Sequence, residues 1–225
     1  MIQVKNLSKI YKQGELEVKA VNNISMKVYD GEFTAVVGPS GSGKTTLLNC
    51  IGGLDSCTSG GVIVDGESIS SYSSNQIIKF RLNNIGFVFQ SYNLIPVLSA
   101  KENIEMVMLM LGYKEEERTK RSIELLEKVE MLDMSDRRPN QMSGGQQQRV
   151  AVARALASKP KFILADEPTA NLDSKSTANL LDIMSRLNRE ENITFIFSTH
   201  DQRVIDRARR VVTLVDGKII SDRNE

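Results

Sequence analysis

The segment Gly38–Thr45, GPSGSGKT, constrains the fold of this chain more than any other stretch. It follows Phe33–Val37, a short run of apolar and β-branched residues that is typical of a buried strand. It leads into Lys44–Ile51, where apolar residues recur at helical spacing until Gly52-Gly53 ends the pattern. A loop of the pattern G-x-x-x-x-G-K-[ST] between a buried strand and a helix binds phosphate. The segment therefore predicts a strand–loop–helix unit of an α/β protein that binds a nucleoside triphosphate.

The residue types of this loop account for the predicted chemistry. Its glycines let the backbone wrap around a phosphate group and point N–H groups at it, and the start of the helix adds partial positive charge. We expect Lys44 to reach the β- and γ-phosphates and the Thr45 hydroxyl to bind Mg²⁺. A flexible turn is a poor alternative, because a chance match in a chain of average composition is about one in a hundred. The residues expected to hold the nucleotide are Gly38, Pro39, Ser40, Gly41, Ser42, Gly43, Lys44, Thr45 and Thr46.

Length and composition bound the remaining possibilities. A chain of 225 residues, 40% of them hydrophobic and 25% charged, can bury one core with a substantial insertion. This composition excludes a disordered, collagen-like or disulfide-scaffold protein. Lysine and arginine number 29 and aspartate and glutamate 28, so the net charge of +1 gives no basic bias toward nucleic acid or an anionic membrane. Cys50 and Cys57 form no metal or redox motif, which favours idle thiols in a reducing cytosol.

The sequence predicts no segment that enters a membrane. Met1–Lys5 reads as a polar-alternating strand and not as an apolar export signal. The most apolar short run, Met106–Leu111, is far below the roughly 20 residues that cross a bilayer. This run is most simply the core face of a helix, and a methionine-rich groove for a partner helix is the minority interpretation. A membrane process would therefore need another chain.

Strand and helix patterns alternate along the chain, which predicts an α/β protein with a parallel sheet interrupted by a helical unit. Beyond Gln90 the apolar residues recur at helical spacing, and strand patterns return at Phe162. The expected strands are Phe33–Val37, Val62–Val64, Ile85–Phe89, Phe162–Ala165, Thr194–Ser198 and the hairpin Val211–Val215 with Lys218–Ile220. The expected helices are Lys44–Ile51, Gln76–Phe80, Glu102–Leu111, Lys114–Met131, Gln147–Ser158 and Ser176–Arg189.

A second glycine pair opens a predicted helix at Ser143-Gly144-Gly145-Gln146. The serine can cap the helix and the N–H groups can bind an anion, although a serine–glycine pair by itself usually means a plain turn. Downstream, the apolar run Phe162–Ala165 ends in Asp166 and Glu167. A carboxylate at the end of a buried strand suits Mg²⁺, and a second one beside it suits a general base.

The phosphate loop, the Ser-Gly-Gly-Gln segment and the Asp-Glu pair, in this order, resemble the ATP-binding cassette (ABC) ATPases over essentially the whole chain. The resemblance implies a P-loop NTPase core with a mixed sheet, an N-terminal antiparallel β subdomain and an inserted helical subdomain. It assigns residues 1–89 and 159–225 to the ATPase core and residues 90–158 to the helical subdomain. Met142 and Asn171 depart mildly from the family pattern, and neither removes a charged or catalytic group.

The resemblance also implies hydrolysis of ATP to ADP and phosphate, with roles for single residues. Tyr11 would stack on the adenine, and Gln90 would belong to the family's glutamine loop. Glu167 would activate the attacking water, while His200 would contact the γ-phosphate. A lone histidine is more often structural, but the place of His200 after an apolar strand end favours a functional role. The implied catalytic residues are Lys44, Gln90, Glu167 and His200, and the implied Mg²⁺ ligands are Thr45, Gln90 and Asp166.

The chain has one phosphate loop and one Ser-Gly-Gly-Gln segment, and in the resembled family these meet across a head-to-tail dimer. Ser143, Gly144, Gly145 and Gln146 would then contact the ATP bound by the other subunit. The loop Ala170–Asp173 would meet that subunit as well. A homodimer with two intact sites is expected, because every catalytic element is present.

More narrowly, Phe87–Gln90, Asn93–Pro96 and Ala165–Asp173 resemble the lipoprotein-releasing and macrolide-export branch of the family. That branch implies an integral membrane permease as partner, a peripheral place on the cytoplasmic face of the inner membrane, and no nucleic acid. A cell-division-type signalling ATPase, which acts through a permease-like partner without moving solute, stays open as the alternative. Cassettes of ribosomes or chromosomes fit less well, because the chain has a single cassette with closely spaced motifs. A small-molecule kinase would leave Ser143–Gln147 unexplained.

Overall fold

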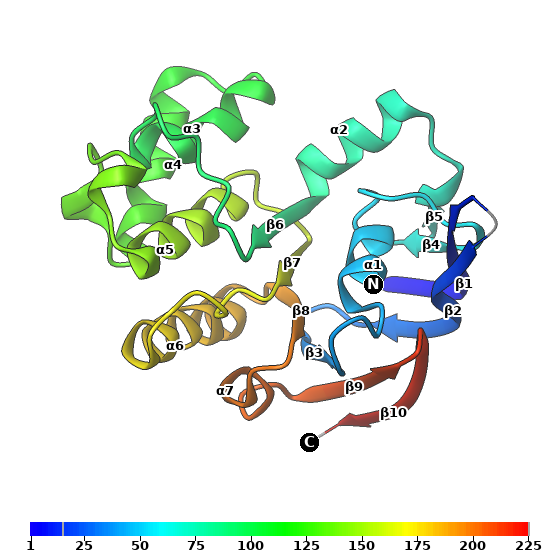
Figure 1. Ribbon diagram of the computed structural model, residues 1–225. Coiled ribbons are helices and arrows are strands. Elements are labelled where there is room, and N and C mark those ends of the chain that lie inside the picture. The colour runs from blue at the N-terminus through cyan, green and yellow to red at the C-terminus, as the bar shows by residue number, and fades with distance from the viewer. Residues whose placement is uncertain (15, 225) are drawn as a thin grey trace.

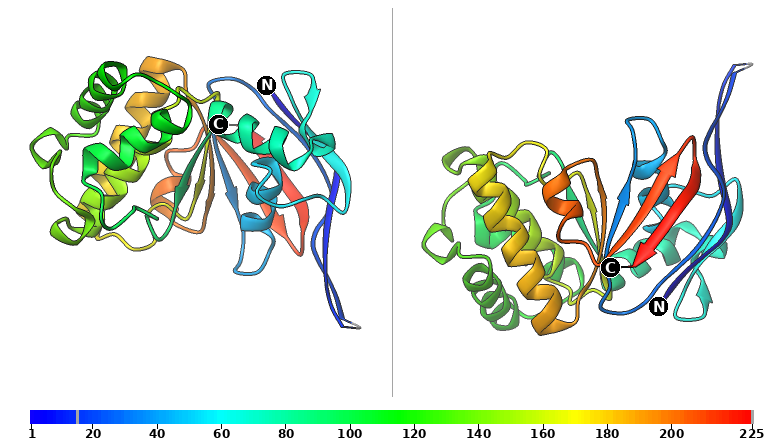
Figure 2. Two further views of the ribbon diagram at one scale, coloured as in Figure 1. Left: turned by 90° about the horizontal axis from the view of Figure 1, so that it is seen from above. Right: turned by 90° about the horizontal axis from the view of Figure 1, so that it is seen from below.

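The computed structural model describes residues 1–14 and 16–224, which form two β-sheets flanked by helices (Figure 1). The smaller sheet is antiparallel and has the strand order β2-β1-β4-β5. Its strands are β1 (Ile2–Gln13), β2 (Leu16–Val28), β4 (Ser59–Val64) and β5 (Glu67–Ser68). Strands β1 and β2 form a long hairpin along one flank of the molecule, and the sequence pattern had predicted only its beginning (Figure 2).

The larger sheet is mixed, with the strand order β10-β9-β3-β8-β7-β6. Neighbours from β9 to β6 pair in parallel, and β10 pairs with β9 in the antiparallel sense. The mixed sheet beside an antiparallel one confirms the predicted fold class. The strands are β3 (Phe33–Val37), β6 (Ile85–Phe89), β7 (Phe162–Asp166), β8 (Thr194–Thr199), β9 (Arg210–Val215) and β10 (Lys218–Asn224).

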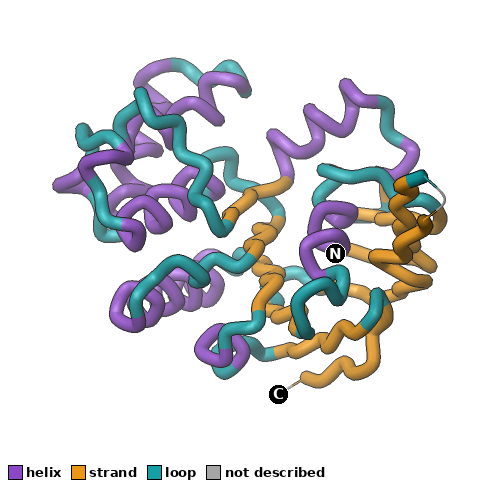
Figure 3. Tube along the Cα trace, viewed as in Figure 1, coloured by secondary structure: helices purple, strands orange, loops and turns teal. Residues whose placement is uncertain are grey.

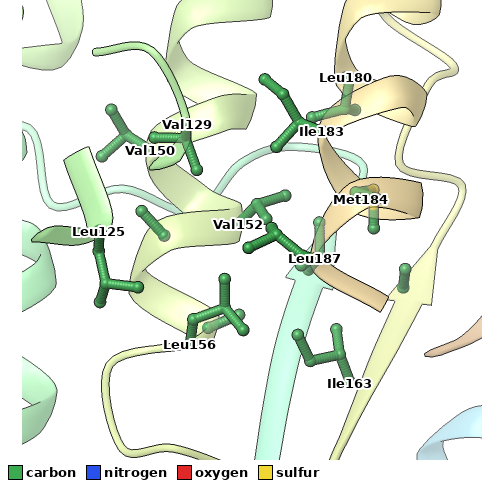
Figure 4. Packing of buried hydrophobic residues seen from close by; sticks show 14 of the residues in the cluster. Leu125, Val129, Val150, Val152, Leu156, Ile163, Leu180, Ile183, Met184 and Leu187 are labelled. Atoms are coloured by element: carbon green, nitrogen blue, oxygen red, sulfur yellow. The ribbon is translucent and has the colours of Figure 1, made fainter. Parts of the chain in front are cut away.

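The central strands are buried on both faces, as expected for parallel strands covered by other elements on either side. Because side chains alternate along a strand, each strand contributes to two separate cores. Ile163 and Phe195 face the helical side, where they join the cluster that includes Val152 and Leu187 (Figure 4). Phe162, Leu164 and Ile196 face the other side and pack with the helix after the phosphate loop and with the antiparallel sheet. The sheet therefore joins the two halves of the molecule.

The helices divide into those beside the antiparallel sheet and those on the far side of the larger sheet (Figures 1 and 3). Helices α3 to α5 lie between β6 and β7 in the chain, in the stretch predicted to be helical, and the division at residues 90 and 158 stays a prediction. The helices are α1 (Lys44–Ile51), α2 (Ser74–Asn84), α3 (Ala100–Met110), α4 (Glu115–Lys128), α5 (Gly144–Ala155), α6 (Ser174–Glu191) and α7 (Gln202–Ile205), with 3₁₀ turns at Ile69–Ser71, Leu132–Met134 and Pro139–Gln141. None of the helices in the described residues could span a lipid bilayer.

Two local predictions need correction. Helix α5 begins at Gly144 and not at Gln147, because the Ser143 side chain accepts a hydrogen bond from the Gln146 N–H and offsets the poor helix propensity of two glycines. The run Met106–Leu111 is helical to Met110 but is not simply core: Met108 is 1% exposed, whereas Leu109 and Met110 are each 58% exposed. Only one face of this helix packs, so the other face remains at the surface.

Candidate nucleotide-binding and catalytic site

The phosphate loop joins the carboxyl end of β3 to α1 and has a shape that only glycine tolerates at two positions. Gly38 has φ 153°, and a Cβ added there would lie 2.0 Å from the Leu214 carbonyl oxygen. Gly43 has φ 99°, and its added Cβ would lie 2.0 Å from the Ala20 carbonyl oxygen. These close approaches tie the loop to β9 and β2, so that its backbone is held in place around the predicted phosphate position.

Lys44 lies in the concave side of this loop and is only 8% exposed. Its Nζ donates hydrogen bonds to the carbonyl oxygens of Gly38 (2.9 Å) and Pro39 (3.0 Å). The ammonium group is thus held across the loop next to backbone N–H groups, where it can attract an anion. The contact of Lys44 with the β- and γ-phosphates stays a prediction.

A pocket of about 730 Å³ opens above the loop and brings together residues that are distant in sequence. It collects the loop itself, Gln90 after β6, Glu167 after β7 and His200 after β8. These strands are parallel, so their carboxyl ends share one edge of the sheet, which is where α/β folds bind ligands. The described residues that line the pocket are Val18, Lys19, Ala20, Gly38, Pro39, Ser40, Gly41, Gly43, Lys44, Thr45, Thr46, Gln90, Glu167, Ala170, His200, Asp216 and Gly217.

Thr45, which lines the pocket, contacts Asp166 at the end of β7, and Asp166 itself is not among the described residues that line the pocket. The Thr45 hydroxyl donates to the Asp166 carboxylate at 2.9 Å and 3.1 Å. A hydroxyl and a carboxylate, with the Gln90 side chain lining the same pocket, form a set of hard oxygen donors. This donor chemistry fits Mg²⁺, which prefers oxygen ligands and keeps several of its own waters.

Glu167 occupies a strained backbone position beside this pair. Its φ is 46°, in the left-handed region, which costs a non-glycine residue about 1–3 kcal/mol. Its N–H donates to the Ser198 carbonyl oxygen at 2.8 Å, which ties the turn after β7 to β8. The strain is held at a position whose carboxylate faces the pocket, as is common where a side chain must be aimed at a ligand.

The Glu167 carboxylate has one paired and one unpaired oxygen. Oε1 lies 2.7 Å from His200 Nδ1, within hydrogen-bonding distance. Oε2 is buried and has no hydrogen-bond partner among the described residues. A buried acceptor without a partner is costly and indicates a position where a further donor binds.

The loop that carries His200 is anchored through the next residue. The Asp201 carboxylate accepts hydrogen bonds from the Arg203 guanidinium (2.7 Å) and from the Thr169 hydroxyl (2.8 Å). These contacts, the one from Arg203 foremost, lower the pKa of Asp201 to about 2. The segments after β7 and after β8 are therefore linked twice, by Glu167–His200 and by Thr169–Asp201.

The Ser143–Gln146 segment begins α5 away from this pocket. Ser143 is exposed, and none of Ser143–Gln146 is among the described residues that line the pocket. Its two glycines allow close neighbours, since a Cβ on Gly144 would lie 2.6 Å from the Tyr92 hydroxyl and one on Gly145 would lie 2.8 Å from Ser176 Cβ. Within one chain, the two glycine-rich segments are thus not brought together.

The sequence matches the family described as ABC transporter over residues 21–170, which is more than half of the chain. The chain belongs to the ABC transporter family. A second match, to an AAA domain of the putative AbiEii toxin type, covers only residues 135–206.

Relatives of this ABC protein cover nearly its whole length. The ABC transporter ATP-binding protein MJ0796 of Methanocaldococcus jannaschii is 44% identical over 223 residues, which are 97% of this chain and 95% of the relative. The lipoprotein-releasing system ATP-binding protein LolD 1 of Chlorobium chlorochromatii is 47% identical over 204 residues, 90% of this chain and 83% of the relative. The macrolide export ATP-binding/permease protein MacB of Brucella melitensis is 41% identical over 99% of this chain, which spans only 34% of that relative.

The fold agrees with solved ABC cassettes. The dimeric structure of a post-hydrolysis state of MJ0796, bound to ADP and Pi, aligns with all of this chain and 98% of that one, at 43% identity and a TM-score of 0.92. Together with the family match, this similarity makes the chain an ATP-binding and ATP-hydrolysing subunit of an ABC transporter.

Tyr11 is placed differently from the other predicted site residues of this ABC ATPase. It is 41% exposed on β1, its hydroxyl donates to Asp55 Oδ2 at 2.6 Å, and Lys9 Nζ lies 4.9 Å from its ring centroid. It is not among the described residues that line the pocket, so its stacking on adenine stays a prediction.

Several pocket residues of the ABC ATPase were not predicted. Val18, Lys19 and Ala20 come from β2, and Asp216-Gly217 is the turn between β9 and β10. The turn was expected from its Asp-Gly sequence, but its place was not. It reaches the site because the Gly217 N–H donates to the Ser42 carbonyl at 3.0 Å, a contact between distant segments that no local pattern signals.

Proposed function

We propose that two copies of this ABC ATPase close on ATP, with the phosphate loop of one facing Ser143–Gln146 of the other, and that the pair drives a membrane permease of the lipoprotein-release or macrolide-export kind. The observation that carries the proposal is the split between the two segments. Ser143 caps the N-terminus of α5, an anion-binding position, yet lies outside the described lining of the pocket. A second copy can bring this helix start to the nucleotide. The dimeric structure of the similar MJ0796 cassette supports this arrangement.

The chemistry proposed for the site follows from the geometry of its own side chains. Lys44 and the loop N–H groups attract the phosphates and stabilise negative charge on the γ-phosphoryl group. Glu167 orients the attacking water and takes up its proton. His200, whose Nδ1 lies 2.7 Å from Glu167 Oε1, contacts the γ-phosphate in the proposal. Water adds to the γ-phosphorus, and ADP leaves with the oxygen of the broken bond.

Mg²⁺ belongs to this proposal as the metal that the oxygen donors fit. Thr45, Asp166 and Gln90 are the residues that would hold it, Asp166 through water. When bound, the ion supplies positive charge beside the phosphate oxygens.

The proposed permease contact is an apolar groove of about 430 Å³ beside the glutamine loop. It is lined by Ile78 from α2, Phe87 and Phe89 from β6, and Met110 from α3, with Arg154 from α5 at one side. Phe89 immediately precedes Gln90, so an occupant of the groove would lie next to the catalytic pocket. We take the occupant to be a helix of a permease on the cytoplasmic face of the inner membrane. The relative MacB, a macrolide export ATP-binding/permease protein, supports this choice.

Nucleotide-dependent dimerisation tests the first half of the proposal. A Glu167→Gln chain binds ATP without completing hydrolysis, so light scattering in ATP should show a dimer, and in ADP a monomer. Lys44→Ala should stay monomeric in both nucleotides. A Glu167→Gln chain that remains monomeric at saturating ATP contradicts the proposed closure.

Recovery of the partner tests the second half. Affinity purification from detergent-solubilised membranes of the native host should recover a polytopic membrane protein with the wild-type chain and lose it with Met110→Glu. Ile220→Glu, at an exposed apolar residue on β10, serves as the control and should retain it. Recovery of soluble proteins alone would overturn the permease partner. Stimulation of the purified complex by a cargo supports transport, whereas activation of a wall hydrolase supports the signalling alternative.

A further inference from the structure

Gln148 is a buried polar side chain in the second turn of α5 that the proposed chemistry does not use. It is 0% exposed, although a glutamine is usually at the surface. Its amide group donates to two main-chain carbonyl oxygens, that of Phe89 at 3.3 Å and that of Pro168 at 2.8 Å. Both hydrogens of the amide are thus bonded to main-chain carbonyls outside α5, one at the end of β6 and one just after β7.

The two carbonyls flank the groups that carry the reaction. Phe89 precedes Gln90, and Pro168 follows Glu167. Phe89 and Asp166 are register partners on the parallel strands β6 and β7, so Gln148 bridges two adjacent strand ends. A rigid shift of α5 would therefore displace the main chain beside Gln90 and beside Glu167 at the same time.

A second contact couples the same two segments. Asn171 Nδ2 donates to the Gln90 carbonyl oxygen at 3.1 Å, and the Tyr92 hydroxyl lies 3.5 Å from the Asn171 carbonyl oxygen. Asn171 and Pro168 both belong to the segment that follows Glu167. The segments after β6 and after β7 are thus linked to each other and, through Gln148, to the helix that begins at Ser143.

The remaining atom of the amide distinguishes Gln148 from a residue that merely fills space. Its Oε1 is buried and has no hydrogen-bond partner among the described residues. An apolar side chain of the same volume would avoid that unsatisfied acceptor, so packing alone does not account for a glutamine here. The two donated hydrogen bonds are what the apolar side chain could not provide.

We propose that Gln148 is a positioning residue for ATP hydrolysis, which holds the Gln90 and Glu167 segments in register with the helix that begins at Ser143. It acts through the main chain of Phe89 and Pro168 and touches neither nucleotide nor water. Movement of α5, whether caused by a permease or by a second subunit, changes the aim of both catalytic side chains together. The inference rests on the roles proposed above for Gln90 and Glu167 in ATP hydrolysis, and not on the identity of the permease or cargo.

The test replaces Gln148 by methionine, which keeps length and volume but removes the donors. We expect kcat for ATP to fall by about 10- to 100-fold with KM little changed, since misplaced catalytic groups cost rate without weakening ground-state binding. Hydrogen exchange should become faster in residues 90–92 and 169–171. Gln147→Met is the matched control: its amide donates to Met142 within its own helix start, and we expect wild-type kinetics.

An unchanged kcat in a folded Gln148→Met chain would overturn the proposal, and so would an equal loss in Gln147→Met. A rise in KM that accounts for all of the lost kcat/KM would assign Gln148 to nucleotide binding and also overturn it. If Gln148→Met does not fold, hydrogen exchange of the wild-type chain decides. Addition of a non-hydrolysable ATP analogue should then protect residues 90–92, residues 169–171 and the first two turns of α5 together, and independent changes in these segments refute the coupling.

Discussion

Two helix starts in this protein carry glycines and serines, yet they are built differently. At α1 the N-cap residue is Gly43, no described side chain caps the helix, and the first-turn N–H groups remain available to a ligand. At α5 the N-cap residue is Ser143, which forms a capping box: its Oγ accepts from the Gln146 N–H at 3.3 Å, and Gln146 Oε1 accepts from the Ser143 N–H at 2.8 Å.

The difference fits the proposal that the phosphate loop binds ATP within one chain and that the Ser143 segment acts only across a dimer. The loop before α1 wraps around a pocket of about 730 Å³ and brings its own lysine. The start of α5 uses its serine and glutamine to hold its own shape, and offers a phosphate only the donors that remain. We therefore expect the phosphate loop to bind ATP in a single chain, and the Ser143 segment to matter only when a second chain presents it.

The largest expected effect is on turnover at the prebuilt site. Glu167→Gln removes the proposed proton acceptor and should lower kcat by about 10²- to 10⁴-fold while ATP still binds. Steady-state phosphate release measures the rate, and nucleotide titration measures the affinity.

Glu130→Gln is a matched control for this change. Glu130 also has a left-handed backbone, with φ 58°, but its carboxylate is half exposed and pairs with Arg149 and Arg186. Its substitution should leave kcat unchanged. A similar loss in both variants would mean that the rate does not depend specifically on the carboxylate in the pocket.

The next effect concerns affinity in the single chain. Lys44→Ala removes a charge-assisted contact to the phosphates and should weaken ATP binding by about 10- to 100-fold, which calorimetry can measure. Lys101→Ala, at a partly exposed i,i+4 ion pair with Glu105 on α3, should bind as the wild type does. Equal affinity in wild type and Lys44→Ala would contradict this contrast, because the phosphate loop would then not bind ATP through its own lysine.

The residues that line the pocket around the phosphate loop were largely predictable from sequence because they lie in short local motifs. Each motif lies at the carboxyl end of a buried strand, so recognising Phe33–Val37 and Phe162–Ala165 was enough to bring Lys44 and Glu167 to one edge of the sheet. What could not be predicted depends on long-range pairing. Ala20 and Gly217 reach the pocket through the long β1–β2 hairpin and a contact with Ser42, and neither leaves a local pattern.

Polar contacts inside the core could not be predicted from the sequence either. Gln148 belongs to a run of three glutamines, and nothing in that run shows which one is buried. The helical period puts Gln148 on the inner face only once the start of α5 is known, and that start depends on the cap at Ser143. The three-residue error at this helix start and the missed role of Gln148 thus share one cause.

A smaller effect tests the Ser143 segment, which is proposed to act only across a dimer. Ser143→Ala removes the α5 cap and should lower the free energy of unfolding by about 1 kcal/mol, measured by denaturant titration. The single-chain affinity for ATP should not change, since Ser143 is not among the described residues lining the pocket. Turnover should fall at the same time, because the second chain can no longer present this hydroxyl.

Ser99→Ala separates these two roles of the serine. Ser99 caps α3 in the same way, with its Oγ accepting from the Glu102 N–H at 3.2 Å. Its substitution should cost the same stability and leave turnover intact. An equal fall of turnover in both variants would show that loss of helix stability, and not loss of a contact across a dimer, lowers the rate.

The smallest effect probes the far end of α1. Stabilisation of the Cys57 thiolate form by the neighbouring Cys50 thiol foremost, and by the Ser70 hydroxyl and the Lys9 charge, lowers the pKa of Cys57 to about 7. The thiolate is the reactive form and increases as pH rises through the pKa, so alkylation of Cys57 by iodoacetamide should be half-maximal near pH 7. The buried Cys50 has a raised pKa and should stay unmodified. In Cys50→Ala the midpoint should move up toward about 8.5, the ordinary value for a cysteine.

The same titration in saturating ATP sharpens the comparison of the two helix starts. Cys50 lies near the C-terminus of α1, the helix that begins at the phosphate loop, so any movement of the loop on binding would pass along this helix to the thiol pair. A loop whose shape is already set by the contacts of Gly38 and Gly43 has little movement to transmit, and the alkylation midpoint should therefore be the same with and without nucleotide. A shift of the midpoint in ATP would mean that the phosphate loop, like the start of α5, is completed only when its ligand arrives.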